Sequence, residues 1–255
     1  MSLSYCIKFV CQQTNIDRMN IKAHVPNTIT LLNLFSGCIA LLFAFQQNYL
    51  LAFYFVALGI FLDFFDGFFA RLFNVSGELG LQLDSLADMV TSGVTPGLVM
   101  YMMMMNSSTP TGSDINTWFP YLGFVITLGS CYRLAKFNID LRQSDSFIGL
   151  PTPANALLIL SLPLVLQFSN SLMMLELLTD RWVLLGITLL SSYLLNAEIP
   201  LFSLKIKKFN FADNKLQIFF LLFSLVLLIF LQYTGIPLVI ISYVIFSIVS
   251  NKMRK

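Results

Sequence analysis

Four aspartates lie in otherwise apolar surroundings, and they are the residues with the clearest chemical use. Asp63 and Asp66 occur in the stretch Asp-Phe-Phe-Asp-Gly-Phe-Phe-Ala-Arg, and Asp84 and Asp88 follow in Gly-Leu-Gln-Leu-Asp-Ser-Leu-Ala-Asp. A carboxylate that is removed from water is stable only where a metal ion, water or a cationic group compensates its charge. The four acids therefore predict a functional site.

Helical spacing brings these acids onto two faces that can meet. On ideal helices, one segment gathers two acids, two small residues and an arginine within an arc of about 140°: Asp63, Asp66, Gly67, Ala70 and Arg71. The next segment stacks Gly80, Asp84 and Asp88 within about 80°. Only residues 74–78 separate the two segments, so we expect antiparallel neighbours whose four carboxylates converge.

Clustered oxygen ligands without histidine or cysteine suit Mg²⁺ or Mn²⁺ better than zinc or copper. Two such ions, bridged by shared carboxylates, would neutralise the acids and bind the oxygens of a diphosphate. Small side chains at Gly67, Ala70 and Gly80 would let a substrate approach the helices, although helix packing explains Gly80 equally well. Arg71 would clamp the diphosphate.

Histidine and cysteine chemistry is excluded by the residue counts. His24 is the single histidine, so a Ser-His-Asp triad and a multi-histidine metal site are not expected. The four cysteines form neither a disulfide framework nor a CxxC zinc motif; they stand at positions 6, 11, 38 and 131. Catalysis must therefore use carboxylates.

The composition places these acids in a membrane protein. Lys and Arg (15) with Asp and Glu (13) make only 11% of the 255 residues, whereas hydrophobic residues make 57%. This balance excludes a soluble domain, a disordered chain and, at a net charge of +2, a nucleic-acid binder. Four aspartates deep in a bilayer would cost around 10 kcal/mol, which strengthens the case for a compensating metal.

The sequence predicts an all-α polytopic membrane protein with about eight transmembrane helices. A spanning helix needs about 20 mostly apolar residues. Polar, proline or glycine breaks divide the chain into eight such stretches, of which the fifth, sixth and eighth are short or poorly separated, so six or seven spans stay open. The predicted spans are residues 25–46, 49–73, 80–106, 117–139, 152–169, 173–196, 213–233 and 236–251.

The positive charges predict the orientation. In the eight-span arrangement, fourteen of the fifteen Lys and Arg residues fall on one side, and only Arg181 lies at the other. Loops rich in Lys and Arg stay in the cytoplasm, so both termini should be cytoplasmic. Arg71 then marks the cytoplasmic boundary, and Asp63 lies about 12 Å deeper. The site should sit just beneath the cytoplasmic headgroups, where a lipid phosphate can meet a soluble substrate.

The spacing of the four acids resembles a known sequence signature. The pattern D-x2-D-G-x2-A-R-x8-G-x3-D-x3-D between residues 63 and 88 resembles the complete signature of the CDP-alcohol phosphatidyltransferase family. That resemblance implies a membrane-embedded helical bundle, usually a homodimer, which moves a phosphatidyl group from a CDP-linked lipid to an alcohol and releases CMP.

Site roles follow from the same resemblance. It implies that Asp63, Asp66 and Asp84 bind metal, and that Asp88 binds the second metal and acts as general base on the acceptor hydroxyl. Gly67 and Arg71 would contact the CDP moiety. A carboxylate is an adequate base because a nearby metal acidifies the alcohol.

Four further stretches are similar to the type II, membrane-integral phosphatidylserine synthases of that family. They are residues 26–33, 84–96, 133–138 and 149–155. This similarity implies CDP-diacylglycerol and L-serine as substrates. Lys136 stands where many relatives have arginine, which keeps the charge but loses the bidentate fork.

Those stretches supply further candidate substrate-binding residues. Arg133 lies about 9 Å inside the cytoplasmic end of its span, where a charge is expected to be functional. With Lys136 it is a candidate for holding the serine carboxylate or the lipid phosphates. Asn27 and Thr30 are candidates as well, although helix caps and interhelical hydrogen bonds are equally ordinary uses for them.

Two alternatives remain at this point. A sister enzyme could use glycerol 3-phosphate as its acceptor, and a cation transporter could use the aspartates as an ion site. The expected organisation is an N-terminal cytoplasmic or interfacial segment (1–22), a catalytic transmembrane core (23–200), and a C-terminal helix pair with a basic tail (201–255).

Overall fold

The computed structural model describes residues 21–75, 77–107, 118–140, 148–169, 171–201 and 215–253. Across these ranges every regular element is a helix, and only Ile148 and Pro200 form an isolated β-bridge. The predicted all-α class is therefore confirmed for this part of the chain. The predicted segment 1–22 lies almost wholly outside the described residues.

A long helical hairpin supplies the first wall of the bundle. Helix α2 (Ile21–Phe45) turns at residues 46–48 into α3 (Tyr49–Phe73), and Asn48 caps α3 by accepting a hydrogen bond from Leu51 N at 3.3 Å. At the other end of α3, Asn74 adopts a left-handed conformation (φ 52°, ψ 44°) and its N–H bonds to the Ala70 and Arg71 carbonyls. This cap ends α3 and turns the chain back towards α2.

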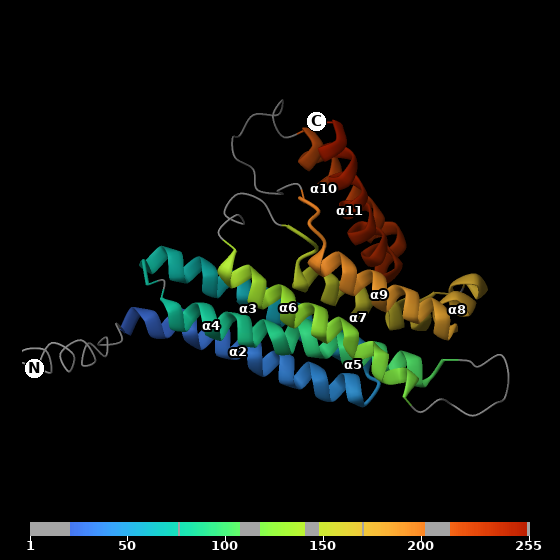
Figure 1. Ribbon diagram of the computed structural model, residues 1–255, viewed down its shortest axis with the longest axis horizontal. Helices are drawn as coiled ribbons and strands as arrows, with labels where there is room; N and C mark the ends of the chain where they lie inside the picture. Colours follow the sequence, from blue (N-terminus) through green and yellow to red (C-terminus); the bar gives the residue numbers. More distant parts are fainter. Residues whose placement is uncertain are drawn as a thin grey trace, which may run out of the picture.

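The third predicted span is one helical rod with an irregular middle. Helix α4 (Glu78–Asp88) continues into the π-helical segment η1 (Met89–Val94) and then α5 (Thr95–Met105). Thr95 N and Oγ1 both bond to the carbonyl of Val90, five residues earlier, and Pro96 follows without an N–H to offer. Figure 1 shows α4 lying beside α2, so the rod returns along the hairpin.

The remaining helices close the bundle and add a separate pair. A 3₁₀ turn, η2 (Phe119–Phe124), leads into α6 (Val125–Ile139), and α7 (Thr152–Phe168) and α9 (Arg181–Asn196) pack near it. The C-terminal pair is α10 (Lys215–Leu231) and α11 (Gly235–Met253), joined by η4 (Gln232–Thr234). The three-residue η4 turn makes the pair antiparallel, and the rings of Phe220 and Tyr243 pack between its helices with centroids 5.6 Å apart. Figure 1 shows the pair inclined away from the other helices.

The prediction of a single continuous helix at residues 173–196 is wrong. The stretch 173–196 forms two helices, α8 (Leu172–Thr179) and α9, with Asp180 between them in an extended conformation. The Asp180 carboxylate accepts hydrogen bonds from Trp182 N at 2.8 Å and Val183 N at 2.9 Å. This side-chain cap starts a new helix and interrupts the old one.

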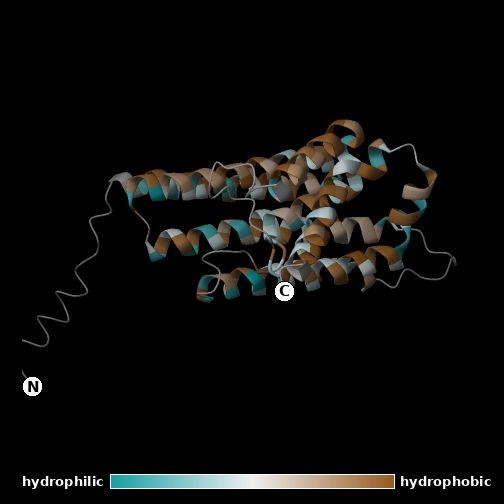
Figure 2. Ribbon diagram, turned by 90° about the horizontal axis from the view of Figure 1, so that it is seen from above, coloured by the Kyte–Doolittle hydropathy of each residue, from teal (hydrophilic) through white to brown (hydrophobic). Residues whose placement is uncertain are grey.

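The structure supports a membrane protein, with the number of spans still a prediction. Among the described residues, three helical stretches are long and apolar enough to cross a membrane: His24–Phe45, Tyr49–Phe73 and Gln217–Ser250. The last contains the η4 turn. The other predicted spans coincide with shorter or interrupted helices. Hydrophobic residues are found along all the helices (Figure 2), and many large apolar side chains, such as Phe35 at 63% and Phe230 at 80%, are exposed.

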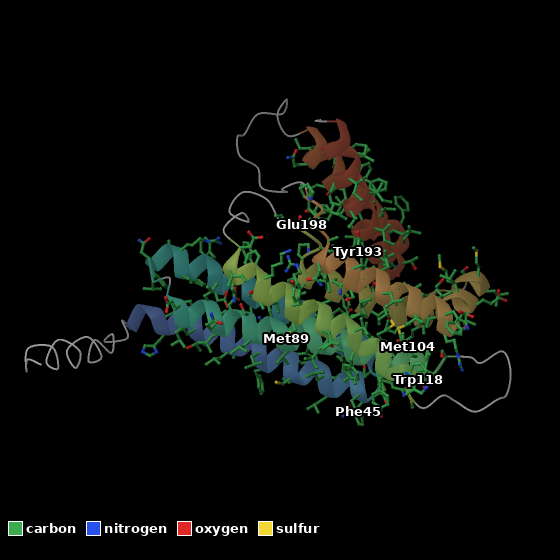
Figure 3. All side chains as sticks on the ribbon, viewed as in Figure 1. Phe45, Met89, Met104, Trp118, Tyr193 and Glu198 are labelled. Atoms are coloured by element: carbon green, nitrogen blue, oxygen red, sulfur yellow. The ribbon has the colours of Figure 1, made fainter. Side chains whose placement is uncertain are left out.

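Apolar packing is concentrated at one end of the bundle. Its buried members come from the end of α2, the start of α3, and η2, α5, α6, α7, α8 and α9; they include Ala44, Ala52, Met100, Ile159 and Leu184. In Figure 3, Phe45, Met104 and Trp118 lie near this end, whereas Met89 lies nearer the middle. This apolar, dry end holds the helices together. The four aspartates singled out by the sequence lie towards the opposite end.

Candidate active site

Three of the four aspartates form one cluster. Asp63 and Asp66 project from α3 and Asp84 from α4, and one carboxylate oxygen of each lies within 4.8 Å of the other two. Helices α3 and α4 both pack against α2, and this brings the three carboxylates together. All three are at least partly buried.

The cluster has the chemistry of a divalent cation site. The Oδ1 atom of Asp84 is buried and has no hydrogen-bond partner among the residues that the structure describes. A buried acceptor without a donor is unfavourable, and carboxylates this close repel one another. A hard cation such as Mg²⁺ or Mn²⁺ would satisfy both conditions, because it takes carboxylate oxygens as ligands.

Asp88 lies beside this cluster. It is 9% exposed, and its Oδ1 accepts a hydrogen bond from Asn33 Nδ2 at 3.3 Å. Its charge interacts with those of Asp63, Asp66 and Asp84 and, with opposite sign, with that of Arg133. The fourth acid is thus near the other three but faces the interior of the bundle, and it is not part of the three-oxygen cluster.

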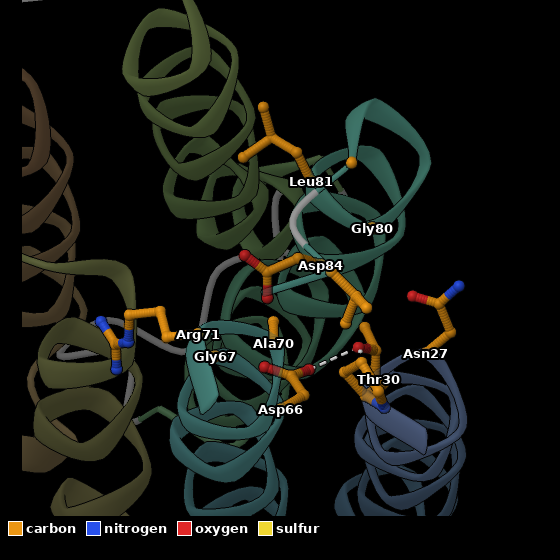
Figure 4. Close-up of a pocket in the computed structure, with 12 residues that line it drawn as sticks. Asn27, Thr30, Asp66, Gly67, Ala70, Arg71, Gly80, Leu81 and Asp84 are labelled. Atoms are coloured by element: carbon orange, nitrogen blue, oxygen red, sulfur yellow. Dashed lines mark hydrogen bonds between the residues drawn. The ribbon is translucent and has the colours of Figure 1, made fainter. Parts of the chain in front are cut away.

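A cavity of about 280 Å³ opens next to Asp66 and Asp84 (Figure 4). Asn27 and Thr30 border it from α2, and Thr30 Oγ1 donates a hydrogen bond to Asp66 Oδ2. The helix ends and the connection between α3 and α4 supply the remaining lining residues: Pro26, Gly67, Ala70, Arg71, Val75, Gly77, Gly80 and Leu81.

Gly67 leaves space for a ligand. A Cβ atom built on Gly67 meets no other atom within 4 Å, so this glycine is not required for close helix packing. At Gly80 the nearest atom is Asn27 Oδ1 at 3.5 Å, an ordinary contact. Both glycines therefore keep the cavity wide, and the packing explanation for Gly80 has little support.

Arg71 stands at the rim of the cavity. Its side chain is exposed and, in Figure 4, lies on the opposite side of the cavity from Asn27. A guanidinium at this place can reach an anionic ligand in the cavity while it remains in contact with water.

Arg133 is buried on the inner side of the site. It is 8% exposed, its Nη1 donates to Thr152 Oγ1 at 3.4 Å, and its Nε has no partner within the described part of the chain. Lys136, one helical turn further along, pairs instead with Glu198 at 3.6 Å, and that pair is largely exposed. Neither residue borders the 280 Å³ cavity.

Sequence reasoning missed the residues that hold Asp88. Asn33 is fully buried and contacts both Asp88 and Thr91, but it was not among the candidate site residues. Its position three residues after Thr30, on the same face of α2, was the available signal. Thr152, which contacts Arg133, was also missed.

Comparisons with known proteins agree with the geometry. The CDP-alcohol phosphatidyltransferase family matches residues 23–182. A CDP-diacylglycerol–serine O-phosphatidyltransferase from Helicobacter pylori (strain J99) is 32% identical over 209 residues, which cover 81% of each chain.

Proteins of the same name from two other organisms are also similar to this chain. The Bacillus subtilis protein is 35% identical over 134 residues, 51% of this chain and 70% of the relative. The Saccharomyces cerevisiae protein is 33% identical over 171 residues, 61% of this chain and 58% of the relative.

Replacing one carboxylate should weaken metal binding before any substrate is present. Asp84→Asn removes one charge from the cluster, so we expect the affinity for Mn²⁺ to fall at least about tenfold, or about 1.4 kcal/mol. Electron paramagnetic resonance of free Mn²⁺ in titrations of detergent-solubilised protein measures this directly. Glu78→Gln, an exposed change on the same helix, is the control and should bind like the wild type. Equal affinities of the two variants would contradict the assignment.

Proposed function

The chain belongs to the CDP-alcohol phosphatidyltransferase family, and we propose that it transfers the phosphatidyl group of CDP-diacylglycerol to L-serine. A bond forms between the serine hydroxyl oxygen and the lipid-linked phosphorus, the bond from that phosphorus to CMP breaks, and phosphatidylserine and CMP are the products. The observation that carries this function is the cluster of Asp63, Asp66 and Asp84 beside a cavity in apolar helices, in a chain whose relatives carry that activity in their names.

We propose that Asp63, Asp66, Asp84 and Asp88 together hold two divalent cations, Mg²⁺ or Mn²⁺. Two observations support this: Oδ1 of Asp84 has no hydrogen-bond partner in the described ranges, and the three carboxylate oxygens lie close together. When bound, the ions would neutralise the diphosphate charge and polarise the phosphorus. Thr30 orients one of these carboxylates by its hydrogen bond to Asp66.

The cavity is the proposed site for the CDP moiety. Small side chains keep the cavity wide at Gly67, Ala70 and Gly80. Arg71 at the rim would pair with the diphosphate. Asn27 would offer its amide from the facing helix. In the predicted topology, the cavity lies at the cytoplasmic side of the membrane. The nucleotide would therefore enter from water while the acyl chains stay in the bilayer.

Asp88 is the proposed general base. It lies beside the cluster and is buried, so it can accept the proton of the serine hydroxyl as the new bond forms. Arg133 is buried, its charge interacts with that of Asp88, and its Nε has no partner among the described residues, so it would bind the serine carboxylate. Lys136 would assist from the cytoplasmic side, although its ion pair with Glu198 favours a smaller contribution.

The wider organisation remains part of the proposal. We place the catalytic core at residues 23–200, which contain the whole family match. Eight spans, cytoplasmic termini and a cytoplasmic site are supported by the distribution of Lys and Arg. We propose a homodimer because the family resemblance implies one.

The choice of acceptor is tested by product release. Purified protein with CDP-diacylglycerol and Mn²⁺ or Mg²⁺ should release CMP when L-serine is added, and not with glycerol 3-phosphate. CMP is quantified by chromatography, and the lipid product by mass spectrometry. Release with glycerol 3-phosphate would identify the sister activity. Cation flux in proteoliposomes without any CMP release would indicate a transporter.

Asp88→Asn should separate catalysis from binding. The substitution keeps the shape but removes the proton acceptor, so we expect kcat to fall at least about a hundredfold, within the range for loss of a general base. The KM for CDP-diacylglycerol should change by less than about threefold, because Asp88 does not border the cavity. Turnover close to that of the wild type would refute the role of base.

Arg133→Ala should act on serine. Loss of a charge-assisted contact to the serine carboxylate should raise the KM for serine about tenfold or more, with little change in the KM for CDP-diacylglycerol. Arg181→Ala is a suitable control, because Arg181 packs over the Phe119 ring at 5.4 Å on the far side of the bundle. An unchanged serine KM and kcat in the Arg133 variant would remove this residue from the acceptor site.

A further inference from the structure

Two polar residues on the inner face of α2 each bind a different aspartate. Thr30 donates to Asp66, and Asn33, one turn later, donates to Asp88 Oδ1 at 3.3 Å. Residues three apart lie on the same helix face. Helix α2 therefore contacts both the proposed metal cluster and the proposed base, and of these two residues Thr30 borders the cavity and Asn33 does not.

Thr91 fixes the orientation of the Asn33 amide. The Thr91 hydroxyl lies 2.9 Å from Asn33 Oδ1 and 3.3 Å from the Asn33 backbone carbonyl, and it can donate to both. Because the amide oxygen is occupied by this donor, the amide nitrogen must face Asp88. Asn33 and Thr91 are fully buried, so water does not compete for these bonds.

The backbone is shaped to allow this contact. Thr91 lies in the π-helical segment η1, three residues after Asp88. A Cβ atom on Gly59 would stand only 2.7 Å from Asn33 Oδ1 and from Thr91 Cγ2, and one on Gly37 would overlap the Thr91 hydroxyl. Two glycines on separate helices thus let three segments meet at Thr91.

We propose that Asn33 and Thr91 are positioning residues for Asp88. Asn33 holds Oδ1 and so would set the direction in which Oδ2 faces the second metal ion and the acceptor hydroxyl, and Thr91 prevents the amide from turning over. Neither residue touches the substrate. This inference rests on the proposed function, because it assumes that Asp88 is the base.

The chain offers a test that separates orientation from packing. Thr91→Val keeps the branched shape but removes the hydroxyl, whereas Thr91→Ser keeps the hydroxyl and removes the methyl that packs near Gly59. If Thr91 orients Asn33, the valine variant should lose about tenfold or more in kcat and the serine variant less than about threefold, since small misplacements of a reacting group are costly. If Thr91 only fills space, the serine variant should be the poorer enzyme.

A mutant cycle tests whether Thr91 acts through Asn33. Asn33→Ser shortens the side chain so that it no longer reaches Asp88, and we expect a loss in kcat of about tenfold or more at an unchanged KM for CDP-diacylglycerol. Adding Thr91→Val to this variant should then cost little more, because residues of one network are not additive. Ser36→Ala is the matched control: Ser36 is a buried α2 residue that bonds to the Phe55 carbonyl at 2.7 Å, and kcat should stay near the wild-type value.

Mn²⁺ binding, followed by electron paramagnetic resonance without substrate, provides the readout besides activity. All variants should keep the Mn²⁺ affinity of the cluster of Asp63, Asp66 and Asp84 within about threefold of the wild type, because Asn33 and Thr91 bond to Asp88 and to each other. Equal kcat values for Thr91→Val and Thr91→Ser, additive losses in the cycle, or wild-type turnover of Asn33→Ser would each overturn the proposal. If Thr91→Val does not fold, the Asn33→Ser and Thr91→Ser measurements still decide it. Absence of CMP release by the wild type would instead reject the proposed function.

Discussion

The repulsion between carboxylates in an apolar bundle is the constraint on which the rest of the site depends. Asp63, Asp66 and Asp84 bring one oxygen each within 4.8 Å of the others, and Asp88 lies close enough to add its charge. Such an arrangement is stable only with compensating cations and donors. Thr30 and Asn33 supply two of the donors. The buried Oδ1 of Asp84, which has no partner in the described part of the chain, is a place where a cation could bind.

That constraint explains why the bundle has a dry end and a polar end. The apolar core is gathered around the end of α2, the start of α3 and the end of α5, where it holds the helices in register. The helix ends on the opposite side are then free to separate around a cavity without loss of the core. The π-helical segment η1 marks the change, because it lies directly after Asp88 and before the buried part of α5.

Much of this arrangement could be predicted from the sequence, because it follows from local periodicity. The i, i+4 spacing of Gly80, Asp84 and Asp88 and the short loop before them place the acids together, and the long apolar stretches mark the helices. Two features could not be predicted, since they depend on particular backbone bonds. The break between α8 and α9 comes from the capping bonds of Asp180, and the contact between Asn33 and Thr91 requires a π turn and two distant glycines.

Successive turns on one face of α2 would divide the work of the site. Asn27 and Thr30 border the cavity and would meet the nucleotide, whereas Asn33 lies behind the carboxylates in a dry contact with Thr91. Residues that meet a ligand can change with that ligand, but a dry network tolerates change poorly, since every donor lost leaves a buried acceptor unpaired. The base would therefore be held by parts of the fold that do not select the substrate. Under the proposed function, acceptor choice would then fall to Arg133, whose charge interacts with that of Asp88.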